Sequence, residues 1–189
     1  MKALVSPQLF TMVCLAGSML FVSCSHKKQN DLSQTILALK ETGQLVTSEY
    51  TLGKVIRASD DKTWYKIGDR KIIINCEAYL KAGVNLQNIT TGNFAAYKDD
   101  SLAITLPHAQ VFSLNIPPNR IQVAFEDVGT FRSAFSAAER EELVAQAEPQ
   151  ILSLADSLGV LQTAENNAAV FIQHLFEEAG YTKTSVQFR

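Results

Sequence analysis

The spacing of hydrophobic residues changes its period along the chain, and each period predicts a different kind of element. Apolar residues three and four positions apart, followed by Gly43, predict a short helix that begins near Leu32. From Leu45 the apolar residues alternate with polar ones, which is typical of strands. We expect strands, in chain order, over residues 45–58, 63–67, 70–81, 102–114, 121–125 and 184–188. A Gly68–Asp69 turn is expected to join the second and third of these, and Ala82–Gly83 to end the third.

The strand predicted over residues 70–81 has one apolar side, which we expect to face the core. Its inward residues are Ile72, Ile74, Cys76, Ala78 and Leu80. Pro107 lies within the strand predicted over residues 102–114, and a proline removes one backbone donor from a sheet. A bend or an edge position is therefore expected at Pro107, whereas the polar residues 85–101 predict a loop.

Helical periodicity returns after Ser136. Ser136 and Glu139 have the spacing of a capping box, in which each side chain accepts a backbone N–H of the other residue. The apolar residues of this first helix, up to Gly159, are Leu143, Ala147, Ile151, Leu154 and Leu158. Pro149 lies inside this helix and is expected to bend or split it. The inward residues of a second helix, up to Gly180, are Leu161, Ala164, Ala168, Phe171, Leu175 and Phe176.

These elements together predict an α+β fold. Helices with one apolar stripe and a sheet with one apolar side bury those surfaces against each other. We therefore expect an antiparallel, partly curved β-sheet of about five or six strands packed against a C-terminal helical hairpin, with a short N-terminal helix.

The N-terminal residues are typical of an export signal. Lys2 precedes the uncharged apolar run Leu9–Val22, which is short for a membrane-spanning helix. Ser23 and Cys24 follow, and the chain then becomes polar. This order resembles the lipobox of bacterial lipoproteins, in which the cysteine becomes the lipid-bearing N-terminus. We expect a signal peptide over residues 1–23, lipidated Cys24 with a polar tether over 24–31, and a single α+β domain over 32–189.

The residue after Cys24 favours one location for the domain. Ser25 is not the acidic residue that resembles an inner-membrane retention signal, and no acidic cluster follows it. We therefore expect the outer membrane, with the domain on its periplasmic face and the membrane as a partner through the N-terminal lipid.

Composition and charge narrow the classes of function. The chain has 189 residues, with 17 Lys and Arg against 19 Asp and Glu, and a net charge of −2. Nucleic-acid binding depends on a cationic surface, so no nucleic-acid partner is expected. Cys14 and Cys24 lie before the predicted domain, which leaves it Cys76 alone and no intramolecular disulfide.

Several segments of the domain resemble a known family. They are Gly43–Tyr50 (GQLVTSEY), Ile67–Ile74 (IGDRKIII), Ala82–Leu86 (AGVNL) and Thr105–Ala109 (TLPHA), followed by the two helices. Their order over residues 32–188 is similar to that of the bacterial domain-of-unknown-function family 4230. The resemblance implies the architecture and a membrane-tethered location, and it implies no known reaction or ligand.

Residues that could carry out chemistry are few. The sequence contains no H-E-x-x-H, G-x-S-x-G, C-x-x-C or glycine-rich phosphate motif, so we assign no catalytic residue, metal site or cofactor. His108 follows Pro107 and could meet Asp99 or Asp100, although we favour an exposed histidine at a strand end. Cys76 lies on the apolar side of its strand and is expected to be a core residue.

Aromatic and cationic residues occur together around the predicted turn. Trp64 and Tyr65 lie close to Arg70 in the sequence and could contact a ligand or a partner. We favour a structural interpretation, in which the two aromatic side chains pack between neighbouring strands and the cations beside them are solvated.

Three functions of different classes remain. The first, which we favour, is a non-enzymatic, lipid-anchored envelope protein that binds a partner or serves envelope architecture. It predicts an exposed apolar patch or a long edge strand. The second is a periplasmic module for a small ligand, with an aromatic-lined pocket between the sheet and the helices. The third is a hydrolase that brings His108 within hydrogen-bond distance of Asp99 or Asp100.

Overall fold

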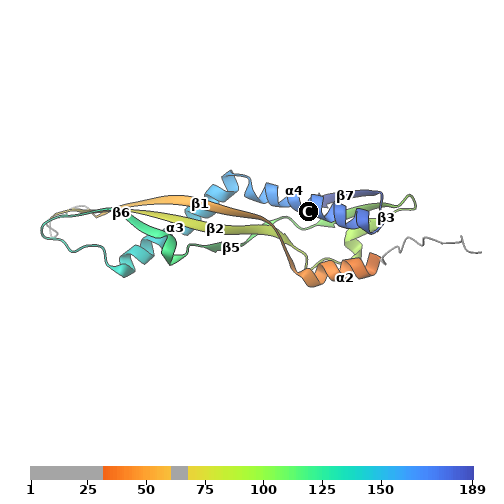
Figure 1. Ribbon diagram of the computed structural model, residues 1–189, viewed down its shortest axis with the longest axis horizontal. Coiled ribbons are helices and arrows are strands. Elements are labelled where there is room, and N and C mark those ends of the chain that lie inside the picture. The colour runs from red at the N-terminus through yellow and green to blue at the C-terminus, as the bar shows by residue number, and fades with distance from the viewer. Residues whose placement is uncertain (1–31, 61–67) are drawn as a thin grey trace, which may run out of the picture.

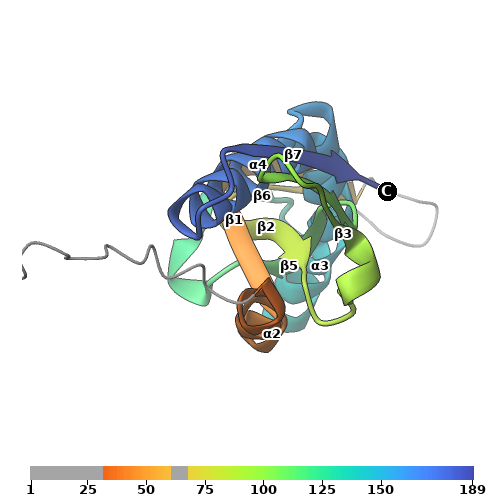
Figure 2. The same cartoon turned by 90° about the vertical axis from the view of Figure 1, so that its right-hand side faces the viewer.

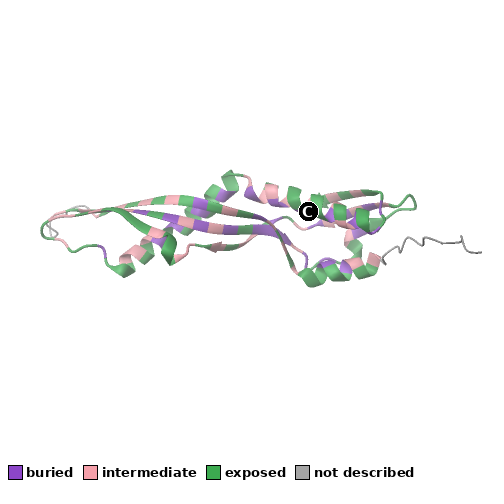
Figure 3. Ribbon diagram, in the orientation of Figure 1, coloured by how far each residue is buried: buried purple, intermediate pink, exposed green. Residues whose placement is uncertain are grey.

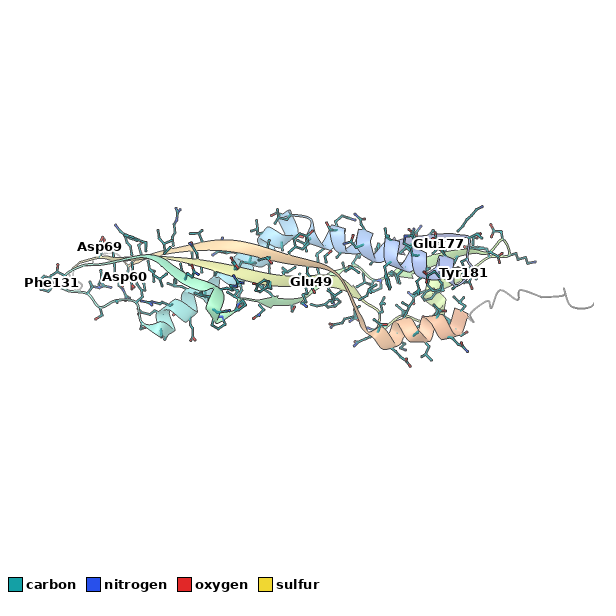
Figure 4. All side chains as sticks on the ribbon, viewed as in Figure 1. Glu49, Asp60, Asp69, Phe131, Glu177 and Tyr181 are labelled. Carbon is teal, nitrogen blue, oxygen red and sulfur yellow. The ribbon has the colours of Figure 1, made fainter. Side chains whose placement is uncertain are left out.

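The protein forms an elongated molecule (Figure 1). The computed structural model describes residues 32–60 and 68–189. Cys24 and the predicted signal and tether lie outside these ranges, as do Trp64, Tyr65 and the strand expected over residues 63–67. We call the end where helix α2 (Leu32–Thr42) begins the proximal end. The opposite end, where Asp60 and Asp69 lie (Figure 4), is the distal end.

A long antiparallel hairpin extends along the molecule. Strand β1 (Gln44–Asp60) pairs with β2 (Arg70–Asn85) from Gln44 opposite Asn85 to Asp60 opposite Arg70. Seventeen residues of β1 span about 55 Å at about 3.3 Å per residue. The other edge of β2 pairs with β6 (Ile121–Val128) toward the distal end and with β5 (Gln110–Asn115) toward the proximal end. The predicted inward residues of β2, among them Cys76, are all buried, which confirms the core side of this strand.

Strand β2 continues through Gly83, so the predicted strand end at Ala82–Gly83 is wrong. Gly83 pairs with Val46 at a point where the register of β1 shifts. A Cβ atom at Gly83 would overlap the backbone carbonyl of Leu45. This glycine therefore permits a close approach of two backbones inside a strand, which a sequence pattern does not distinguish from a strand end.

A smaller sheet lies at the proximal end. It consists of β3 (Phe94–Ala96), β4 (Ser101–Leu106) and β7 (Lys183–Phe188), and β7 runs parallel to β4. The strand predicted over residues 102–114 is thus two strands, β4 and β5, which belong to different sheets and are separated at Pro107. The expected loop over residues 85–101 contains β3, and short 3-10 turns occupy Thr91–Asn93 and Pro118–Arg120.

The C-terminal helices are α3 (Ala137–Ser157) and α4 (Val160–Glu178), and they follow one another along the long axis (Figure 1). The capping box at Ser136 and Glu139 is confirmed. Helix α3 continues through Pro149 as one helix, so the expected split does not occur. Its buried residues are Val144, Ala147, Ile151 and Ala155, whereas Leu154 and Leu158 are exposed.

The main core lies at the proximal end, where α4 packs on both sheets. Viewed along the long axis, α4 lies beside β7 and across β1 and β2 (Figure 2). Its buried residues are Val160, Ala164, Ala168, Ile172 and Phe176, and they meet the buried side of β4 and of β2. Exposed residues predominate at the distal end (Figure 3), where a separate cluster contains Ile72, Ile74, Phe135 and Val144. The α+β class, the antiparallel main sheet and the C-terminal helical pair agree with the sequence prediction.

Candidate functional surface

Helices cover one side of the large sheet, and the other side, which we call the outer face, faces solvent. Alternation along β1 directs Val55 and Arg57 to this face, opposite Asn75 and Ile73 of β2. Phe125 of β6 lies beside Ile73. Val55 is 52% exposed and Phe125 is 50% exposed. The outer face therefore presents an apolar patch of Val55, Ile73 and Phe125 to water.

Two shallow hollows lie along the outer face. One, of 340 Å³, has Ile73 and Phe125 beside the cations Arg57 and Lys71. The other, of 400 Å³, is lined from Gly53 to Val55 on β1 and includes polar side chains of β2 and β6. Because both are open to solvent over apolar residues flanked by charges, this face has the composition of an interaction surface.

The outer edge of β1 adds to this surface. Among the described residues β1 pairs with β2 alone, so it lies at the edge of the large sheet. Helix α4 covers the edge near the proximal end, where the Thr47 hydroxyl donates to the Ala164 carbonyl at 2.7 Å and the Asn167 amide donates to the Thr47 carbonyl at 2.9 Å. From Gly53 to Ser59, no described strand pairs with the edge of β1 that faces away from β2. An edge strand of this kind can pair with another chain.

Arg70, one of the predicted contact residues, is held inside a cluster of charges at the distal end. Its guanidinium donates to Glu139 at 2.5 Å and to Asp60 at 3.2 Å, and it lies 4.2 Å from the centre of the Phe135 ring. Its side chain is 14% exposed. The hydrogen bond from Arg70, together with hydrogen bonds from the Ser136 backbone and hydroxyl, lowers the pKa of Glu139 to about 2.

Arg132 completes this distal charge cluster of Asp60, Arg70, Arg132 and Glu139. Its guanidinium pairs with Asp60. Beside it, Phe131 is 77% exposed and lies at the distal tip (Figure 4). The backbone here is held by a hydrogen bond from Gly129 N–H to the Asp69 carbonyl at 2.9 Å. The cluster thus fixes the end of the hairpin to the start of α3.

His108 is placed next to an acid that the sequence analysis did not single out. Its Nδ1 lies 2.8 Å from the Glu165 carboxylate of α4, which also accepts the backbone N–H of Ala109 at 3.1 Å. The His108 side chain is 68% exposed, while that of Glu165 is 13% exposed. Glu165 lies 57 residues from His108 in sequence, and no local pattern indicates such a contact.

Asp99 and Asp100 lie at the other end of β4 from His108. The six residues of β4 separate the two sites by about 20 Å along the strand. Asp99 accepts the Ser101 hydroxyl at 2.6 Å, and this hydrogen bond lowers its pKa. Asp100 has a φ of 55° in the turn that joins β3 to β4. The structure does not bring these two aspartates to His108.

Cys76 is a core residue, as predicted. It is buried, and its thiol donates to the Lys54 carbonyl at 3.6 Å. Burial raises the pKa of the thiol, which favours the unreactive neutral form. Across residues 32–60 and 68–189, His, Cys, Asp and Glu side chains form no group of three that could bind a metal ion.

The space between the large sheet and the C-terminal helices is filled by buried side chains, including Ile151, Ile172 and Phe176. A groove of 460 Å³ lies elsewhere, between α2 and α4 at the proximal end. Its lining includes Leu39, Leu45 and the aromatic ring of Phe171. Within the described part of the chain, no helix has the length and apolar composition needed to cross a membrane.

Comparison with known proteins relates these features to one family. The family model described as "Protein of unknown function (DUF4230)" matches residues 38–186, from within α2 to β7. Neither the curated proteins nor the solved structures gave a significant match. The family match includes both sheets, both C-terminal helices and the outer face. The chain therefore belongs to the DUF4230 family.

Proposed function

We propose that this protein is a non-enzymatic, lipid-anchored component of the bacterial cell envelope, whose outer face binds a protein partner. The observation that carries the proposal is the outer face itself. It combines the exposed apolar patch of Val55, Ile73 and Phe125 with an edge of β1 on which no second strand pairs among residues 32–60 and 68–189. An apolar patch flanked by charges and next to a free strand edge offers both side-chain and main-chain contacts to a protein.

The positions of the N-terminal helix and of the patch along the molecule support anchoring at the proximal end. The described chain begins at Leu32, at the proximal end, and Cys24 lies eight residues earlier in sequence. The patch lies on the distal half of β1 and β2. A lipid on Cys24 would therefore hold the proximal end at the bilayer and leave the outer face accessible at a distance from it.

Site-specific photocrosslinking in the native host tests the binding surface. A photoreactive phenylalanine analogue replaces Phe125 in the full chain, and the same analogue replaces exposed Ala145 on α3 as the matched control. We expect a discrete adduct from position 125 that is lost when Val55→Asp is added, because a charge at the patch opposes apolar contact. Equal adducts from the two positions, or no effect of Val55→Asp, would contradict the proposal.

The anchor is tested separately. We expect mass spectrometry of the protein from its native host to show residue 24 as the N-terminus with acyl chains attached. Cys24→Ala should abolish this modification. A bare Cys24, or a chain that retains residues 1–23, would reject the anchor while leaving the partner surface open to its own test.

A further inference from the structure

The groove between α2 and α4 differs in chemistry from the other hollows of the surface. Its lining consists of apolar and uncharged polar side chains: Gln34, Thr35, Ala38, Leu39, Thr42, Leu45, Phe171 and Leu175. The two hollows of the outer face, by contrast, include Arg57 and Arg120. A site without a charged group has no means to pair with an ionic ligand, and it favours hydrocarbon.

The groove also exposes apolar side chains that neighbouring elements do not cover. Phe171 is 48% exposed although it lies on α4, whose other side is the centre of the main core. The lining extends from Gln34 to Thr42, which is about 12 Å along a helix. The groove therefore follows α2 over about two helical turns.

The position of the groove indicates where such a chain comes from. Gln34 and Thr35 lie in the first turn of α2, so the groove begins where the described chain begins. Leu32 lies eight positions after Cys24, so the two residues are at most about 28 Å apart. If Cys24 is lipidated, the groove is therefore confined near the bilayer surface, where acyl chains are at high local concentration.

We propose that the groove between α2 and α4 binds one acyl chain of a bilayer phospholipid. This inference rests on the proposed anchor, which brings the groove to the membrane. In this proposal Leu39, Leu45, Phe171 and Leu175 contact the hydrocarbon. The bound lipid adds a second point of attachment to the one at Cys24. This second attachment fixes the orientation of the elongated domain relative to the membrane.

Labelling from vesicles tests the proposal. The full-length protein purified from its native host is added to phosphatidylcholine vesicles that contain a phospholipid with a diazirine in one acyl chain. After irradiation, we expect peptides that contain residues 34–45 and 171–175 to carry the label. Ala38→Trp should lower this labelling about tenfold, because an indole in the groove excludes the last few methylenes of the chain. Ala145→Trp, the same change at an exposed alanine of α3, should leave it unchanged.

Two results would overturn the proposal. One is labelling spread over the surface or unaffected by Ala38→Trp. The other is labelling of the groove solely from a photoreactive chain carried on Cys24, which would make the protein's own anchor the occupant. The N-terminal peptide of the same sample distinguishes failure of the anchor from failure of the groove. Groove labelling with a bare Cys24 rejects only the anchor, and a lipidated Cys24 without groove labelling rejects only the groove.

Discussion

The proximal and distal ends of the domain are stabilised by different interactions. At the proximal end, α4 and two sheets enclose a large apolar core around Phe176. At the distal end, a small cluster around Phe135 lies beside the charges of Asp60, Arg70, Arg132 and Glu139. Apolar burial depends little on protonation, whereas hydrogen-bonded charges depend on it strongly. The two ends should therefore respond differently to mutation and to pH.

The largest expected effect is at the proximal core. Phe176 is fully buried, and its ring lies 5.7 Å from that of Phe94 and 5.9 Å from that of Tyr181. Phe176→Ala should lower the free energy of unfolding by about 3–5 kcal/mol, because it removes a large buried ring and leaves a cavity. Urea denaturation of the full chain measures this change.

Phe171→Ala provides the matched control on the same helix. Its side chain is half exposed, so the loss should be below about 1 kcal/mol. Similar losses for Phe171 and Phe176 would contradict the assignment of the core side of α4.

A smaller and more local effect is expected at the distal charge cluster. Arg70→Met retains apolar contact with Phe135 and removes the hydrogen bonds to Asp60 and Glu139. We expect a loss of about 1–2 kcal/mol that appears as local opening of the hairpin end. Hydrogen exchange measures it: backbone amides of residues 70–74 should lose protection, while those of residues 78–84 keep it. Equal loss along the whole of β2 would show that the two ends unfold as one unit.

The distal charge cluster should also make the stability of the distal end depend on pH. The pKa of Glu139 is lowered from its ordinary value of 4.5 to about 2 by Arg70 and Ser136. Because the folded value lies below the unfolded one, this carboxylate stabilises the fold at neutral pH. Its contribution is complete above about pH 4.5 and is lost progressively as the pH falls toward 2.

Hydrogen exchange of the distal amides between pH 7 and pH 3 checks this direction. Protection relative to the proximal amides should fall with pH in the wild type, and Glu139→Gln should remove that part of the dependence. Glu141→Gln, at an exposed position of the same helix, should retain it. A dependence that is unchanged in Glu139→Gln would refute the role assigned to this residue.

The elements of the fold could be predicted where one local signal decides the structure. The side chains of Ser136 and Glu139 and the alternation from Ile72 to Leu80 depend on near neighbours, and both predictions are confirmed. Gly83 was misjudged because its role depends on the backbone of Leu45, 38 positions away in sequence. Likewise, the sequence shows a break at Pro107 but not that β4 pairs with β7 in a second sheet.

The candidate surface was less predictable for the same reason. An exposed apolar patch or a long edge strand was expected, but Val55, Ile73 and Phe125 come from three strands whose register the sequence does not specify. The partner of His108 is Glu165 on α4, a contact between distant segments. Cys24, Trp64 and Tyr65 lie outside the described residues, so the roles predicted for them stay predictions.

The smallest expected effect concerns Leu154, and it tests the orientation of α3 that links the two ends. The sequence pattern places Leu154 in the apolar stripe with Ile151, whereas in the structure Leu154 is exposed and Ile151 is fully buried. The buried side of α3 includes Ala147 and Ala155 together with Ile151, and the helix contacts β1. Leu154→Gln should therefore change the free energy of unfolding by less than about 0.5 kcal/mol. Ile151→Gln, which buries an amide without a partner, should cost several times more. A large loss of stability from Leu154→Gln, measured by urea denaturation, would mean that α3 is rotated so that Leu154 is buried with Ile151. The side of α3 that packs between the proximal core and the distal charge cluster would then differ from the one described.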